Sequence, residues 1–298
     1  MNYHQPVLLK ESIEGLNIRP DGIYVDATFG GGGHSLEILN HLKKGKLFGF
    51  DQDGDAIQNI PNDKRFTFIN HNFRFLYNFL KYYGIDSIDG LIADLGVSSH
   101  HFEDEERGFS FRKETVLDMR MNRESEFSAN DVINTYTIEK LQTVFSEYGE
   151  VHNARKLASV IVKGREQSPI VQTGQFLELI SECIPPRKEN QYLAKVFQAI
   201  RIEVNNEMSN LKQLLEQCQD VLKTGGRLVV ISYHSLEDRL VKNFIRWGNF
   251  EEEAPKDVFG NSSVPLRAVN RKVIIPREEE IEENNRARSA KLRIAEKI

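Results

Sequence analysis

The sequence predicts an α/β protein: a Rossmann-like, doubly wound parallel sheet with an all-helical domain inserted into it. Two observations carry this prediction. Residues 22–95 alternate between strand-like apolar runs and helix-like segments, as parallel strands joined by right-handed crossovers do. From about residue 105 to 190 no convincing strand is found, and apolar residues recur at helical spacing instead.

Four apolar runs define the first half of the predicted sheet, and each is followed by a helix-like segment. The expected strands are 23–26, 46–51, 65–69 and 88–95. The expected helices between them cover about 35–42, 53–59 and 74–83. This alternation favours a sheet covered by helices on both faces.

The helical insertion is expected over residues 105–200, inside a sheet domain formed by residues 1–104 and 201–298. Apolar stripes such as Ile138, Leu141 and Phe145 predict its helices, and Pro185-Pro186 stops the last of them. The remaining features are expected in the second part of the sheet domain: a helix closed by Thr224-Gly225-Gly226, strands at 227–232, 271–275 and 290–295, a helix at 236–247 and a solvated acidic loop at 278–283.

Composition and charge indicate a cytoplasmic enzyme. The chain has 298 residues, with 40% apolar and 28% charged residues. It shows no apolar run of membrane-spanning length, no secretory signal, and two cysteines without metal-like spacing. The net charge of −5 argues against a protein that coats nucleic acid nonspecifically. Basic residues do gather locally, at 185–201 and 286–297.

The stretch from Tyr24 to Ser35 is the most informative segment of the chain. Asp26 closes the first strand, and the glycines of residues 30–33 follow before a helix. Glycine tolerates positive φ and lets a ligand touch the backbone, and a helix start offers free N–H groups. Asp51 ends the next strand 21 residues after Gly30, the spacing at which an acid reaches a ribose. We therefore expect a cofactor that contains ribose.

The residues around this turn favour S-adenosylmethionine over a dinucleotide. A dinucleotide fingerprint would have a third glycine where Ser35 stands. Asp26 would repel a pyrophosphate, whereas it suits a cofactor with a sulfonium, an ammonium and no phosphate. The pattern Asp26-x-Thr28-x-Gly30-x-Gly32 resembles the first motif of Rossmann-like methyltransferases. The alternative is a tight strand–helix turn without a ligand.

Further polar residues follow two other predicted strands. Asp94, Ser98 and Ser99 come after the fourth strand, and His234 and Ser235 come after the strand at 227–232. Carboxyl ends of parallel strands share one rim, so these residues are expected to converge, although Asp94 and Ser235 could instead cap the loops and helices they precede. No serine lies in a nucleophile elbow, and the adjacent histidines at 100 and 101 point to opposite faces. Neither a hydrolase triad nor a metal is expected.

Six segments of the chain, taken in order, form a specific pattern: Asp26–Ser35, Asp94-Leu95-Gly96-Val97-Ser98-Ser99, Arg107-Gly108-Phe109-Ser110-Phe111, Leu117-Asp118-Met119-Arg120-Met121, Ser232-Tyr233-His234-Ser235 and Arg286-Ala287-Arg288-Ser289. With these segments the chain resembles, over nearly its whole length, the MraW family, the ribosomal RNA small-subunit methyltransferase H proteins. The resemblance implies a methyltransferase that transfers a methyl group to the exocyclic N4 amine of a cytidine in the decoding region of small-subunit ribosomal RNA. It implies S-adenosylmethionine as cofactor and the assembled small subunit as partner; a homodimer stays open.

The resemblance also assigns roles to individual residues. Gly30, Gly32, Gly33 and His34 belong to the motif that meets the methionine end of the cofactor. Asp51 holds the ribose, Phe73 lies near the adenine, and Asp94 completes the pocket. His101 stands where the family usually has glutamine, so its cofactor contact is in doubt.

The chemistry of an exocyclic amine suggests the remaining roles. Its lone pair is delocalised into the ring, so an acceptor for its N–H would hold the lone pair toward the methyl group. Asp94, Ser98, Ser99 and His234 are the catalytic candidates. The target base must be extruded from its helix, and the residues proposed to hold it or the RNA are Arg107, Phe109, Phe111, Arg120 and Arg201. Core packing is the alternative for both aromatics.

Two other classes of function stay open on the sequence alone. One is a methyltransferase of the same fold that acts on a protein or a small molecule. The other is a nonenzymatic RNA-binding assembly factor, against which the intact glycine turn and both acids argue. An enzyme that uses NAD is a third and more distant alternative.

Overall fold

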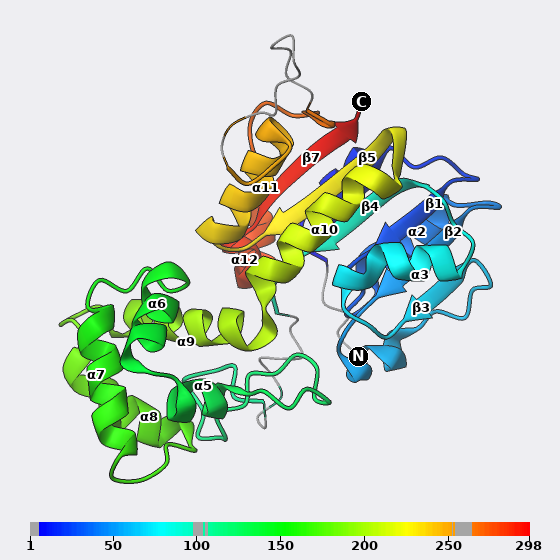
Figure 1. Ribbon diagram of the computed structural model, residues 1–298. Helices are drawn as coiled ribbons and strands as arrows, with labels where there is room; N and C mark the ends of the chain where they lie inside the picture. The colour runs from blue at the N-terminus through cyan, green and yellow to red at the C-terminus, as the bar shows by residue number, and fades with distance from the viewer. Residues whose placement is uncertain (1–5, 98–103, 105–106, 252, 254–263) are drawn as a thin grey trace. The chain divides into compact units, whose positions relative to one another are not determined.

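The computed structural model describes residues 6–97, 104, 107–251, 253 and 264–298 (Figure 1). The chain forms two compact units. One combines Met1–Gly96 with Met208–Ile298, and the other consists of Val97–Glu207. The insertion expected from the sequence has its limits at residues 105 and 200. We call the two parts the sheet unit and the helical unit and describe each by itself.

The sheet unit contains a seven-stranded sheet with the order β3-β2-β1-β4-β5-β7-β6. The strands from β3 to β5 are parallel to one another, whereas β7 runs antiparallel to both β5 and β6. This architecture confirms the predicted α/β class with a Rossmann-like sheet. The strand bounds are β1 Ile23–Asp26, β2 Lys46–Phe50, β3 Phe66–Ile69, β4 Ile88–Asp94, β5 Leu222–Ser232, β6 Leu266–Ala268 and β7 Lys291–Lys297.

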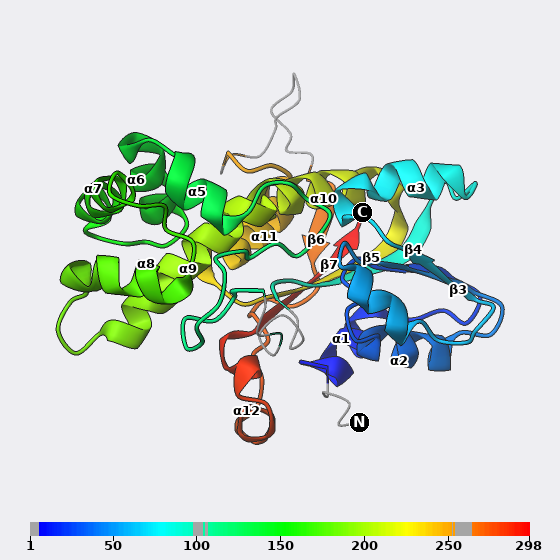
Figure 2. The same ribbon diagram turned by 90° about the horizontal axis from the view of Figure 1, so that it is seen from below.

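Helices cover both faces of this sheet, as Figure 2 shows. Alternate residues of each strand point to opposite faces, so Leu91 and Ala93 of β4 enter one core and Ile92 enters the other. The first core includes helices α3, α10 and α11, and the second includes α1 and α2. The helix bounds are α1 Leu9–Leu16, α2 Gly33–His41, α3 Leu76–Tyr82, α10 Glu207–Val221, α11 Ser235–Trp247 and α12 Glu278–Glu283; short 3-10 helices are η1 Gly54–Asn59, η2 Phe73–Phe75 and η4 Asn285–Ser289.

The helical unit has a hydrophobic core of its own. Leu141 and Phe145, two members of the predicted apolar stripe, and Phe176 of α8 are fully buried in it. An isolated bridge between Val116 and Gln172 is the one β-type pairing among its described residues. Its helices are α5 Ala129–Thr135, α6 Ile138–Glu147, α7 Ala154–Arg165, α8 Thr173–Ile180 and α9 Glu189–Asn205, with η3 at Ser181–Cys183.

Three expectations about the sheet unit were wrong. Residues 271–275 form only a bridge at Ile274, and the acidic segment expected as a loop forms α12. This helix makes a tertiary contact: Glu280 Oε1 accepts the backbone N–H of Leu8 at 2.7 Å. Gly225 and Gly226 do not cap α10; they lie within β5, where its register against β4 shifts. Among the described residues, no helix has both the length and the apolar character needed to cross a bilayer.

Candidate active site

The glycine turn connects the carboxyl end of β1 to the first residue of α2. Gly30 and Gly32 have φ values of +49° and +78°, in the left-handed region that favours glycine. Gly32 is also the N-cap residue of α2. A Cβ at Gly31 would meet no atom within 4 Å, whereas one at Gly33 would overlap the ring of Pro6. The turn therefore needs its glycines for its own geometry and offers open space at Gly31.

Asp26 holds the two ends of this turn together. Its carboxylate accepts the Thr28 N–H at 3.1 Å and the Ser35 hydroxyl at 2.7 Å. The residue is only 2% exposed, and burial raises the pKa of its carboxyl above the ordinary value. Asp26 thus positions the turn through these two hydrogen bonds.

Asp51 lies across from the turn, just after β2. One carboxylate oxygen accepts the Gly30 N–H at 2.7 Å, and the other accepts the Asp53 N–H at 2.8 Å. Burial raises the pKa of this carboxyl to about 6, while the two backbone hydrogen bonds oppose the rise. Each oxygen has a second lone pair, so the carboxylate can also accept a hydroxyl from a ligand.

Asp94 ends β4, the other neighbour of β1 in the sheet. The Thr28 hydroxyl oxygen accepts the Asp94 backbone N–H at 2.6 Å, which ties this strand end to the glycine turn. Asp94 Oδ2 lies 3.9 Å from Nδ1 of His34, the second residue of α2. Burial raises the pKa of the Asp94 carboxyl to about 7 and lowers the pKa of His34.

Phe73 lies at the carboxyl-end rim as well, in the short helix η2 that follows β3. Asn72, its neighbour, donates from Nδ2 to Gln52 Oε1 at 2.7 Å, which joins the segments after β3 and β2. The ring of Phe73 is partly buried against the core that holds α3. The adenine contact expected for Phe73 stays a prediction.

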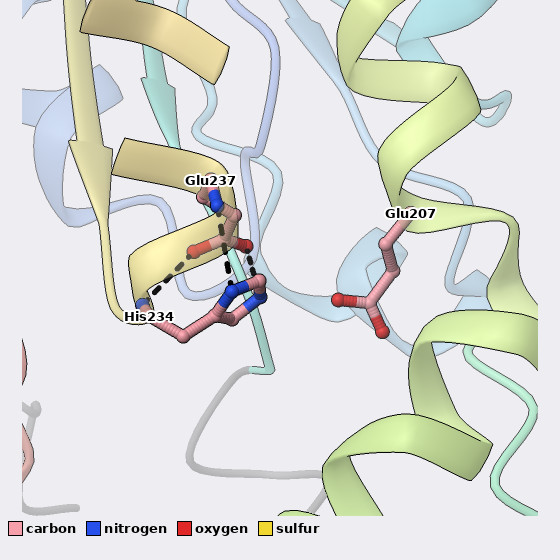
Figure 3. A group of neighbouring side chains, drawn as sticks. All are labelled: Glu207, His234 and Glu237. Carbon is pink, nitrogen blue, oxygen red and sulfur yellow. Dashed lines mark hydrogen bonds and ion pairs between the residues drawn. The ribbon is translucent and has the colours of Figure 1, made fainter. Parts of the chain in front are cut away.

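His234 caps helix α11, as Figure 3 shows together with Glu237. Its Nδ1 accepts the Glu237 N–H at 3.4 Å, and Glu237 Oε2 in turn accepts the Tyr233 N–H at 2.8 Å. Glu237 Oε2 also accepts the His234 N–H at 3.4 Å, which makes the cap reciprocal. His234, and not Ser235, is therefore the N-cap residue of α11. The third residue drawn, Glu207, belongs to the helical unit and pairs with Arg201.

Three of the expected contacts fall on residues that the structure does not describe. Ser98 and Ser99, the serine candidates for accepting the amine N–H, lie outside the described ranges. His101, which stands at the family's glutamine position, lies outside them too. Their predicted roles stay predictions.

The first group of proposed RNA-holding residues is largely buried in the helical unit. Arg107 is 2% exposed, with Nε 3.4 Å from Asp104 Oδ2. Phe109 is 6% exposed within the core, and the ring of Phe111 packs edge-on to Phe197 with centroids 5.6 Å apart. These surroundings favour the packing alternative for both aromatic residues.

Arg120 and Arg201 are both held in two-pronged ion pairs. Arg120 donates from Nε and Nη2 to the two oxygens of Asp118, at 2.7 Å each. Arg201 donates in the same way to Glu207, at 2.8 and 2.9 Å. Such bidentate pairs use the guanidinium face that would otherwise bind a phosphate. The expected phosphate contacts of these two arginines therefore compete with structural ones.

Sequence reasoning missed one residue that contacts the site. Tyr233 directly follows β5, and its hydroxyl donates to Asp94 Oδ1 at 2.7 Å. A signal for it is present in the sequence, because Tyr233 directly follows the strand beside β4, next to the candidate His234. Tyr233 also lines a cavity of about 320 Å³ next to Ser289 and Lys291 of the C-terminal segment.

The charges at this rim select the kind of ligand it can hold. Asp26, Asp51 and Asp94 supply carboxylates, and His34 is kept neutral by its lowered pKa. No lysine or arginine occurs from Asp26 to Ser35. This set repels phosphate and suits a cation that also carries hydroxyl groups.

Comparison with known proteins agrees with this picture. The model of the MraW methylase family matches residues 1–298. The chain is 61% identical to the ribosomal RNA small subunit methyltransferase H of Parabacteroides distasonis, over 99% of this chain and 98% of that protein. It is 59% identical to the protein of the same name from Bacteroides thetaiotaomicron, over 100% and 98%. The chain therefore belongs to the MraW methylase family.

Proposed function

We propose that this methyltransferase transfers a methyl group from S-adenosylmethionine to the N4 amine of a cytidine in the decoding region of small-subunit ribosomal RNA. The relatives named above are methyltransferases of small-subunit ribosomal RNA, which supports the class of substrate. The observation that carries the proposal is the meeting of three features at one rim of the sheet: the glycine turn, Asp51 and Asp94.

S-adenosylmethionine fits the residues present at this rim. The open space at Gly31 admits a ligand to the backbone, and Asp51 keeps lone pairs for ribose hydroxyls. The acidic character of the rim suits the sulfonium and the ammonium. When bound, this cofactor supplies a methyl group that its sulfonium has already made electrophilic, so the protein needs no covalent nucleophile.

The protein's own contribution is alignment and acceptance of a proton. Holding the amine in line with the methyl group converts an encounter into a unimolecular step. Asp94, whose carboxyl has a pKa of about 7, can accept an N–H of the amine and direct its lone pair toward the methyl group. The target cytosine must leave its base stack to reach this rim.

The assembled small subunit is the substrate that we expect, rather than free RNA. The test is transfer of labelled methyl groups to unmethylated small subunits, to protein-free RNA from them, and to their extracted proteins. We expect label in the RNA of the subunits, at one cytidine whose mapped position lies in the decoding region. Label in protein, or at another atom of the nucleotide, would contradict the proposal.

A second arm of this test addresses the assembly-factor alternative. A nonenzymatic RNA-binding protein of this fold would bind subunits but would not need the cofactor. Calorimetric titration with S-adenosylmethionine, and with NAD as the control ligand, separates these cases. We expect binding of the first ligand only.

A further inference from the structure

Tyr233 is held firmly at the carboxyl end of β5. Its backbone N–H donates to Glu237 Oε2 at 2.8 Å, so the first turn of α11 anchors it. Its ring packs against Gly96 of the segment after β4, where an added Cβ would lie 3.5 Å from Tyr233 Cδ2. The first turn of α11 thus holds the backbone of Tyr233, and the neighbouring loop packs against its ring.

The hydroxyl of Tyr233 makes a short hydrogen bond to the carboxylate of Asp94. The oxygen atoms are 2.7 Å apart, with Tyr233 as donor to Oδ1. His34, the other polar neighbour, lies near Oδ2 at 3.9 Å. Because His34 Nε2 faces the carbonyl oxygen of Val7 at 3.2 Å, its proton is assigned to Nε2, and Nδ1 presents a lone pair to Asp94.

It follows that Tyr233 is the one side chain among the described residues that donates a hydrogen bond to the Asp94 carboxylate. Asp94 ends β4, and Tyr233 directly follows β5, the adjacent parallel strand. The pairing of these strands runs to Asp94↔Ile231, so the sheet itself sets the separation of the two residues. The bond occupies Oδ1 and leaves Oδ2 as the oxygen that can face a substrate.

We propose that Tyr233 is a positioning residue for methyl transfer, which fixes the Asp94 carboxylate and keeps it charged so that Oδ2 accepts the proton of the substrate amine. This inference rests on the proposed function, because it takes Asp94 as the acceptor. In the transfer, a nitrogen–carbon bond forms as the methyl–sulfur bond breaks. The amine's proton passes to Asp94, which then releases it to water.

The electrostatics of the pair support this role. Burial raises the pKa of the Asp94 carboxyl to about 7, the charge of Glu237 on α11 raises it further, and the bond from Tyr233 lowers it. His34 on α2 and Asp26 on β1 are the other titratable groups around this end of the sheet, and Glu280 of α12 acts on Tyr233. Tyr233 keeps its own proton, because burial first and Asp94 second raise its pKa well above 10.

The variant Tyr233→Phe tests the inference, since it keeps the ring and removes only the hydroxyl. Without this donor the charged form of Asp94 is less stable, so the acid limb of methyl transfer should move up by about one pH unit. With the parent limb near pH 7, the rate should fall about fivefold at pH 7 and recover almost fully above about pH 9. A role in packing alone would not produce recovery at high pH.

Tyr24→Phe is the matched control. Tyr24 is buried at the opposite end of the same sheet, where its hydroxyl accepts the Arg19 N–H at 2.7 Å. Removing this hydroxyl should leave the pH profile at its parent position. Cofactor affinity measured by calorimetry across the same pH range gives a second readout, because a cationic cofactor should bind less well as Asp94 takes up a proton.

The outcomes separate this inference from the proposed function. An unshifted pH profile in Tyr233→Phe, or a loss equal at every pH, would overturn the role of Tyr233. Full transfer by Asp94→Asn would overturn the role of Asp94 and the inference with it. If the parent methylated no RNA, the proposed function would fail. The effect of Tyr233 on Asp94 would then be judged from cofactor affinity alone. It would survive if the pH midpoint of that affinity moved up in Tyr233→Phe but not in Tyr24→Phe, and it would be overturned otherwise.

Discussion

Site residues were easier to predict from the sequence in the sheet unit than in the helical unit. In the sheet unit, Gly30, Asp51 and Asp94 meet at one rim, joined by short hydrogen bonds. In the helical unit, Arg107 is buried and Arg120 is held by Asp118. Parallel strands bring their carboxyl ends together whatever their side chains do, whereas no comparable rule places side chains on a helical insertion. A motif in a sheet therefore locates a site better than a motif between helices.

The largest effect is expected from a change at Asp94, at the rim of the sheet unit. Asp94→Asn keeps the shape of the side chain and removes its capacity to take a proton. We expect methyl transfer at saturating cofactor to fall by about a hundredfold or more, the usual contribution of a positioned acid or base. Single-turnover assays on unmethylated subunits measure this loss.

Subunit binding by the same variant provides the control. It should equal that of the parent, since Asp94 belongs to the sheet rim and carries no positive charge for phosphates. A tenfold loss of subunit binding would assign Asp94 to the RNA surface instead of the reacting centre.

Asp51→Ala should give the next largest effect. A hydrogen bond to a charged group contributes about 1.5–3 kcal/mol, so the affinity for S-adenosylmethionine should fall roughly ten- to hundredfold. Asp63→Ala is the matched control, because Asp63 also sits beside a strand of the sheet but pairs with Arg65. Equal affinities of the parent and Asp51→Ala would show that Asp51 only holds the turn through Gly30 and Asp53.

The third expected effect is on the pH dependence of the unfolding free energy, through the titration of Asp94. The native state keeps the Asp94 proton up to about pH 7, whereas an unfolded chain loses it near the ordinary value of 3.8. Between these values the native state binds more protons, so the unfolding free energy contributed by this group declines as pH rises. The Asp94 side chain is 24% exposed, which reduces the contribution to on the order of 2 kcal/mol.

Asp94→Asn removes this titration. Thermal unfolding should therefore show the variant to be more stable than the parent above pH 7, with the advantage shrinking toward pH 4. An advantage that stayed constant over this range would mean that the Asp94 carboxyl does not titrate where its burial places it. If the inactive variant is the more stable one, Asp94 lowers the stability of the protein while serving its function. The end of β4 would then be a functional position.

The fold was largely predictable because its pattern is carried by long apolar runs. The bounds of β1 agree with the expected strand, and the other parallel strands of the first half agree within one residue at each end. The failures are elements that depend on distant partners. β6 has three residues and forms by pairing with β7, while the Leu8 contact made by Glu280 in α12 spans 272 residues of sequence. Local periodicity contains no signal for either.

The candidate site was predictable in its backbone and less so in its side chains. Glycines with positive φ and acids at strand ends follow from topology. The bond between Tyr233 and Asp94 joins residues 139 apart and depends on two strands lying side by side. The burial of Arg107 reverses the usual expectation for a charged residue, and its counter-ion Asp104 lies only three residues away.

The smallest expected effect concerns the helical side of the comparison, where the exposed cations are the better candidates for RNA. Arg187 and Lys188 lie between Pro186 and α9, are exposed, and form no ion pair with any residue in the described ranges. They belong to the basic stretch at 185–201, in which Arg201 is already neutralised by Glu207. If this stretch contacts phosphates, the unpaired cations should do so.

Changing Arg187 or Lys188 to alanine should flatten the dependence of log affinity on log salt by roughly 0.7–0.9 of a unit each, because each contact releases about one counter-ion. Methyl transfer at saturating subunit should not change.

Arg120→Ala is the contrasting variant. It leaves Asp118 without its bidentate partner, so it should lower the unfolding free energy by about 1 kcal/mol and leave the salt dependence at the parent slope. Subunit binding across a salt series, with thermal unfolding of each variant, measures both quantities. If Arg120→Ala flattened the slope and the two exposed cations did not, the family motif would locate the RNA surface of the helical unit after all. The contrast between the two units would then disappear.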